Sequence, residues 1–229
     1  MNFETFVPGS GVHLVALLTC IVIPIVVALS GKGMEGMFRK IIAGACLVTW
    51  IATLLYSFHP ERFEWDFSLP LHFCNLANLI GAVAVLSPRR IPKSILYFWG
   101  FTLCPWAFLT PSLEEGPAHL WFWIFWLYHL CIPLSLFWTV IRVHYRPSWA
   151  DLKTILILTW AFTLALALLD HFTGWNYGFV GPGMPLQKSP IDALGPYPIR
   201  ILSMLLIGSA LFLLALLPWL LLQKFRKRS

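Results

Sequence analysis

One cysteine and one histidine are placed where they could act together as a nucleophile and its base. Cys74 and His129 each lie in a long apolar run, and the two runs are expected to cross a membrane in the same direction. At the helical rise of about 1.5 Å per residue, both side chains come to a similar depth in the outer half of the bilayer. A thiol beside an imidazole is an activated nucleophile, because the imidazole takes the thiol proton. The pair indicates a candidate nucleophile and its base.

The sequence leaves the group that orients the imidazole open. The four polar candidates are Asn75, Asp170, Asn176 and Asp192. A purely structural interpretation also stays open, because a single cysteine in a membrane helix often fills space and a single histidine often bonds a neighbouring helix. No metal is expected. In His72-Phe-Cys74 and His129-Leu-Cys131 the two ligand types lie about 200° apart on a helix and cannot easily chelate one ion together.

The composition is that of a membrane protein rather than a soluble domain. Of 229 residues, 59% are hydrophobic and 11% are charged, and the mean hydropathy is +0.76. Soluble domains carry about a quarter charged residues. A net charge of +6 would suggest nucleic acid as the partner of a soluble protein. In a membrane protein it reports orientation, so no nucleic-acid partner is expected.

Seven apolar runs approach the roughly 20 residues that a helix needs to cross the hydrocarbon core. They predict an all-α fold, a polytopic membrane protein whose seven-transmembrane-helix bundle forms a single domain over residues 1–229. The expected spans are Gly11–Leu29, Ile41–Phe58, Leu69–Leu86, Ser94–Leu109, Leu120–Val143, Thr154–Leu169 and Ile199–Leu222. No basic segment or cleavage site accompanies the first run, so it is expected to remain in the membrane.

The loops predict the orientation of this bundle. Most basic residues fall on one side, in the loops after the first, third and fifth spans and in the carboxyl-terminal tail, and most acidic residues fall on the other. The positive-inside rule then places the amino terminus outside and the carboxyl terminus in the cytoplasm. We expect a multi-pass protein of a bacterial-type plasma (inner) membrane, whose basic inner edge is the ordinary consequence of topology.

Two further features bear on function. The middles of the spans contain no charged residue, which disfavours ion-coupled transport. The segment of about residues 171–198 is rich in glycine and proline, and predicts a structured, non-helical lid on the side of Cys74 and His129.

Six short motifs resemble the YwaF family of integral membrane proteins, in the same order and over about residues 68–205. They are Ser68-Leu-Pro-Leu-His72-Phe-Cys74-Asn75, Leu96-Tyr-Phe-Trp-Gly100, Leu109-Thr-Pro111, Tyr128-His129, Asn176-Tyr177 and Leu194-Gly-Pro196. The eukaryotic relatives of this family include an ether-phospholipid acyltransferase that uses a cysteine and a histidine. The position after the cysteine is often aspartate in the family and is Asn75 here.

The resemblance implies a phospholipid acyltransferase or lipase that acts through a cysteine thioester and needs no cofactor. Cys74 would be the nucleophile and His129 its base, and the substrates would be phospholipids and lysophospholipids. The residues expected to support the site or bind the oxyanion are Asn75, His72, Asn176, Tyr177 and Asp192. Two alternatives without catalysis are a seven-span receptor or sensor and a carrier of uncharged solutes. The short cytoplasmic loops disfavour the receptor.

Overall fold

The computed structural model describes residues 3–183 and 190–226, and this part of the chain is helical. Its only β-type contact is an isolated bridge between Thr5 and Glu115. The α-helices are α1 Gly11–Ser30, α2 Glu35–Ser57, α3 Phe73–Leu86, α4 Arg90–Phe98, α5 Pro105–Leu109, α6 Leu120–Ile141, α7 Trp149–Thr173 and α8 Ile199–Arg226. A π-helix, η1 Trp99–Leu103, joins α4 to α5, and two 3-10 helices, η2 Tyr177–Phe179 and η3 Pro190–Leu194, lie between α7 and α8.

Five helices in the described residues are long and apolar enough to cross a membrane: α1, α2, α6, α7 and α8. Most of their large side chains that face outward are aliphatic. A soluble helix would place polar residues there. These helices agree with five of the seven expected spans, and the chain is a multi-pass membrane protein.

The other two expected spans differ from the prediction. The third begins at Phe73 instead of Leu69, because Pro70 restricts the residues before it, and α3 then has 14 residues. At about 1.5 Å per residue it is shorter than the roughly 30 Å hydrocarbon core. The fourth is divided into α4, η1 and α5, with Pro105 at the start of α5. The seven-span count and the orientation stay predictions.

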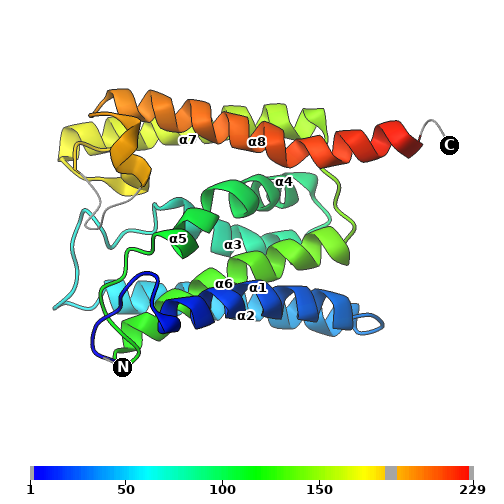
Figure 1. Ribbon diagram of the computed structural model, residues 1–229, viewed down its shortest axis with the longest axis horizontal. Helices are drawn as coiled ribbons and strands as arrows, with labels where there is room; N and C mark the ends of the chain where they lie inside the picture. Colours follow the sequence, from blue (N-terminus) through cyan, green and yellow to red (C-terminus); the bar gives the residue numbers. More distant parts are fainter. Residues whose placement is uncertain (1–2, 184–189, 227–229) are drawn as a thin grey trace.

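The short helices lie between two layers of long ones. Figure 1 shows α7 and α8 along one side, α1, α2 and α6 along the other, and α3, α4 and α5 between them. Backbone that is not helical is costly in lipid unless protein covers it. The long helices therefore shield the places where the short ones begin and end.

A close crossing of α3 and α6 fixes the centre of the molecule. A Cβ atom added to Gly81 of α3 would lie 2.5 Å from the Ser135 Oγ of α6, so only glycine fits there. Three residues earlier, the buried Asn78 donates a hydrogen bond from Nδ2 to the Thr49 Oγ1 of α2, at 3.1 Å. These contacts set the spacing of α2, α3 and α6.

The two ends of the bundle differ in character. The turns between α1 and α2, α3 and α4, and α6 and α7 lie at the same end as the carboxyl terminus (Figure 1). These are the connections in which the sequence concentrates its basic residues. The segment before α3 and residues 174–183, which follow α7, lie at the opposite end.

Candidate functional site

Cys74 lies in the first turn of α3, whose N-cap residue is His72. It is partly exposed, whereas the other four cysteines, Cys20, Cys46, Cys104 and Cys131, are buried. The amide groups in the first turn of a helix lack partners within the helix, and together with the helix dipole they favour a negative charge. The sequence predicted Cys74 a few residues inside a span that begins at Leu69, and the structure places it at the start of the helix, where a thiolate is better stabilised.

His129 is buried in α6, and one of its ring nitrogens has a fixed partner. The Nδ1 atom lies 2.8 Å from the backbone carbonyl oxygen of Phe125, one turn earlier. A carbonyl only accepts hydrogen bonds, so Nδ1 carries the proton and Nε2 presents a lone pair. The Phe125 ring, with its centroid 4.2 Å from that of the imidazole, and the Tyr128 ring at 4.4 Å also hold the imidazole in place.

The structure brings Cys74 and His129 together. Their side chains lie near enough to interact electrostatically, and because Phe125 occupies Nδ1, the Nε2 atom is the one available to the thiol. This is the arrangement of a nucleophile, its base and an orienting group, in which a backbone carbonyl takes the place of the usual side chain.

A second cysteine belongs to this site, and the sequence had not singled it out. The fully buried Cys104 packs against Cys74, and the two thiols are also within hydrogen-bonding reach. The π-helix η1 delivers it there: the Cys104 amide donates to the carbonyl oxygen of Trp99, five residues back, at 2.9 Å. Pro105, which cannot donate a backbone hydrogen bond, was the available signal for this irregularity.

Tyr177 and His72 link the segment that precedes α3 to the loop that follows α7. The Tyr177 hydroxyl donates to the carbonyl oxygen of Trp65 at 2.7 Å and accepts from the Leu69 amide at 2.9 Å. Burial raises the pKa of Tyr177 to about 12, so its hydroxyl stays protonated and able to donate. The Gly178 amide donates to His72 Nδ1 at 3.3 Å, while the His72 Nε2 is buried without a hydrogen-bond partner. We call these contacts the cap. They include Tyr177 and Gly178 of the segment that the sequence predicted as a lid, about residues 171–198, and residues 184–189 of that segment lie outside the described residues.

The remaining expected site residues have other surroundings. Asn176 accepts the Gly181 amide at 2.9 Å and shapes the loop after α7. Asp170 is fully buried near the end of α7, where its carboxylate faces the backbone of Tyr177. Asn75 follows Cys74 in the first turn of α3 and is partly exposed. Asp192 lies in η3, and its side chain is outside the described residues. None of these residues is the partner of the His129 Nδ1 atom, which is the carbonyl oxygen of Phe125.

A metal ion needs several ligand side chains grouped around one point. Within residues 3–183 and 190–226, no three or more histidine, cysteine or acidic side chains are grouped to hold a metal ion.

The chain is similar to proteins of one membrane family. The TMEM164 family model matches residues 9–216. An uncharacterized protein of Treponema pallidum (strain Nichols) is 29% identical over 158 residues, which cover 69% of this chain and 63% of that protein. Subunit 2 of the cytochrome bo(3) ubiquinol oxidase of Buchnera aphidicola is 31% identical over 64 residues, 28% of this chain and 21% of the subunit. The chain thus spans less than two thirds of either relative. No solved structure matches.

Proposed function

We propose that this chain, which belongs to the TMEM164 family of membrane proteins, transfers or hydrolyses the acyl groups of phospholipids through a thioester on Cys74. The observation that carries the proposal is the contact of Cys74, in the first turn of a helix, with an imidazole whose other nitrogen is held by Phe125. The residues that resemble the YwaF family include both Cys74 and His129.

The first half of the reaction forms the thioester. His129 Nε2 takes the thiol proton as the Cys74 sulfur attacks the ester carbonyl carbon of the lipid. The carbonyl oxygen becomes an oxyanion, and the free amide groups in the first turn of α3 are its nearest expected donors. When the tetrahedral intermediate collapses, the carbon–oxygen ester bond breaks and the imidazolium returns its proton to the departing lysophospholipid.

The second half releases the acyl group. The hydroxyl of a second lysophospholipid, or water, gives its proton to His129 Nε2 and attacks the thioester carbon, and the Cys74 thiolate leaves and regains that proton. The choice between transfer and hydrolysis depends on the entry of water, and the cap over the start of α3 limits that entry. Acyl transfer is the outcome that the packing of Tyr177 and His72 supports.

Cys104 would stabilise the charged state of the nucleophile. Its thiol hydrogen can point to the Cys74 sulfur, and a hydrogen bond to a charged group contributes about 1.5–3 kcal/mol. A serine at position 104 would keep that donor, and an alanine would remove it.

Intact-protein mass spectrometry tests the thioester. The wild type and the Cys74→Ala variant would be incubated with phospholipid, with Cys131→Ala as a control that removes a buried thiol from another part of the core. We expect a fatty-acyl mass on the wild type and on the control, removable by hydroxylamine, and none on Cys74→Ala. An adduct that persists in Cys74→Ala, or no adduct with any of several phospholipids, would contradict the proposal and favour a receptor or carrier.

A further inference from the structure

A pocket at the opposite end of the bundle from Cys74 gathers positive charge. It lies between the connection from α3 to α4 and the connection from α6 to α7, and its volume is about 230 Å³. Four basic side chains line it: Arg90, Lys93, His144 and Arg146. We call it the basic pocket.

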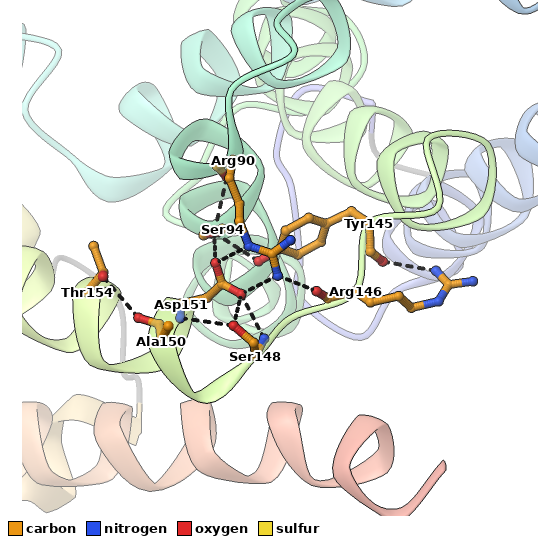
Figure 2. Close-up of polar contacts among 8 residues, drawn as sticks. All are labelled: Arg90, Ser94, Tyr145, Arg146, Ser148, Ala150, Asp151 and Thr154. Atoms are coloured by element: carbon orange, nitrogen blue, oxygen red, sulfur yellow. Dashed lines mark hydrogen bonds and ion pairs between the residues drawn. The ribbon is translucent and has the colours of Figure 1, made fainter. Parts of the chain in front are cut away.

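Arg90 is held rigidly at the edge of the basic pocket. Its Nε donates to Asp151 Oδ1 at 2.7 Å and its Nη2 to Asp151 Oδ2 at 2.6 Å, and Nη2 also reaches the Arg146 carbonyl oxygen at 2.7 Å (Figure 2). The Arg90 side chain is nevertheless 55% exposed, while Asp151 is 6% exposed. A fixed guanidinium with an exposed face is pre-organised to bind an anion.

Asp151 neutralises Arg90 but has no capacity left for the other cations. Its Oδ1 also accepts from the Ser94 hydroxyl at 2.9 Å, and its Oδ2 also accepts from the amide and the hydroxyl of Ser148, at 2.7 and 2.6 Å (Figure 2). A carboxylate has about four lone-pair sites, and five donors already approach these two oxygens.

Among the described residues, the hydrogen-bond and ring partners of Lys93 and Arg146 are carbonyl oxygens and an aromatic ring. Lys93 donates to the Pro88 carbonyl oxygen at 3.3 Å. Arg146 donates to the carbonyl oxygens of Val140 and Tyr145, at 2.7 and 2.9 Å, and its guanidinium lies over the ring of Trp219. Neither side chain forms an ion pair with any part of the chain that the structure describes. Two positive charges in the basic pocket are therefore not compensated.

The backbone adds to this positive field. Arg90 and Lys93 occupy the first turn of α4, which holds no acidic residue. The amino-terminal end of a helix carries partial positive charge and favours anions, so two cations there are unfavourable when no anion is bound. Arg39 of α2 is close enough to Lys93 to repel it as well.

We propose that the basic pocket binds a phosphate group. A phosphate group offers more acceptor oxygens than a carboxylate, and so matches the three cationic side chains Arg90, Lys93 and Arg146 together with a helix terminus. The group has two sources with the same chemistry, inorganic phosphate and the headgroup of an anionic phospholipid. The site is separate from Cys74, and the proposal does not depend on acyl chemistry.

Two measurements on the purified full-length protein distinguish the sources. Native mass spectrometry from micelles with equal amounts of phosphatidylglycerol and phosphatidylcholine reports a retained headgroup, for which we expect preferential retention of phosphatidylglycerol. The midpoint of thermal unfolding in lipid-free detergent, with potassium phosphate compared with potassium chloride at equal ionic strength, reports free phosphate. A positive result in either one supports the proposal and identifies the source, and negative results in both would overturn it.

A matched pair of variants separates a site from general surface charge. Lys93→Gln removes a cation from the basic pocket, and Lys40→Gln removes an exposed cation from α2, outside the pocket lining. One cation at a membrane surface contributes about five-fold in affinity, so we expect Lys93→Gln to weaken binding about five-fold and Lys40→Gln to leave it unchanged. Lys93→Arg should retain binding. Equal weakening by the two glutamine variants would overturn the proposal.

Discussion

Two pairs of cysteines lie against α6, and they differ in what surrounds the sulfur atoms. Cys46 and Cys131 are both buried, and their polar neighbours are the hydroxyl groups of Thr49 and Ser135 and the Cys131 carbonyl oxygen. A hydroxyl group cannot take a thiol proton near neutral pH. This pair is therefore suited to filling the core.

The pair formed by Cys74 and Cys104 has an imidazole beside it. His129 presents a nitrogen lone pair, and Cys74 is the cysteine that is partly exposed. Both pairs consist of neighbouring thiols in an apolar bundle, so the sulfur atoms alone do not distinguish them. The neighbouring base, the helix terminus and the access to substrate do.

The largest expected effect comes from removing the base. A positioned general base contributes about 10²–10⁴-fold to a rate. We expect His129→Gln to slow thioester formation by at least about 100-fold and to reduce the alkylation of Cys74 by iodoacetamide toward the level of Cys46. Peptide mass spectrometry after timed alkylation measures all five cysteines in one sample. Equal alkylation of Cys74 and Cys46 in the wild type would remove the distinction between the pairs.

The second prediction compares the partner thiols. Cys104→Ala removes the proposed hydrogen bond to the Cys74 thiolate, and a loss at the low end of its range, about 1.5 kcal/mol, corresponds to a reaction roughly ten-fold slower. Cys131→Ala should leave the rate of thioester formation unchanged, because it lies beside Cys46. Cys104→Ser should restore most of the rate, since its hydroxyl donates in the same place. Failure of serine to restore the rate would indicate that Cys104 acts only by packing.

The sequence predicted the helical membrane class, and it paired Cys74 with His129 as a hypothesis, for different physical reasons. Long aliphatic runs identify membrane helices almost independently of tertiary structure. Cys74 and His129 could be paired because the depth of each side chain in the bilayer follows from its position within its apolar run. The start of α3 was wrong by four residues, yet Cys74 still lies at the end of the run where His129 can reach it.

Other parts of the site depend on irregular backbone, which apolar runs do not reveal. The shift that brings Cys104 beside Cys74 comes from η1, whose sequence reads as an ordinary apolar span. The partner of His129 is the Phe125 carbonyl oxygen, and every residue has such a group, so no residue type identifies it. From the sequence, the basic residues that line the basic pocket were interpreted only as a sign of membrane orientation. A count of charges does not show that Ser94 and Ser148 already occupy the Asp151 carboxylate.

The third prediction concerns the crossing that positions the two cysteine pairs. Gly81→Ala would place a methyl group 2.5 Å from the Ser135 Oγ, so α3 and α6 must separate. Overpacking of this kind costs about 1–3 kcal/mol of unfolding free energy. Thermal unfolding in detergent measures the loss, and the iodoacetamide experiment shows whether Cys74 has moved from His129. Gly44→Ala is the control, because a Cβ atom there meets no neighbour within 4 Å. A wild-type midpoint for Gly81→Ala would show that the crossing is not tight.

The smallest effect is expected from the cap, and it bears on the access that distinguishes Cys74 from the buried cysteines. Tyr177→Phe removes the hydroxyl that holds Trp65 and Leu69, at a cost of about 1–2 kcal/mol. Only the cap is destabilised, since the ring still packs against His72. We therefore expect faster hydrogen exchange over residues 58–72, unchanged exchange in α6, and a larger share of hydrolysis relative to acyl transfer as water gains entry. Tyr197→Phe, which alters a hydroxyl bonded to His171, is the matched control. If Tyr177→Phe speeds exchange without changing the ratio of hydrolysis to transfer, the cap does not control water at Cys74, and the difference between the two cysteine pairs rests on His129 and the start of α3.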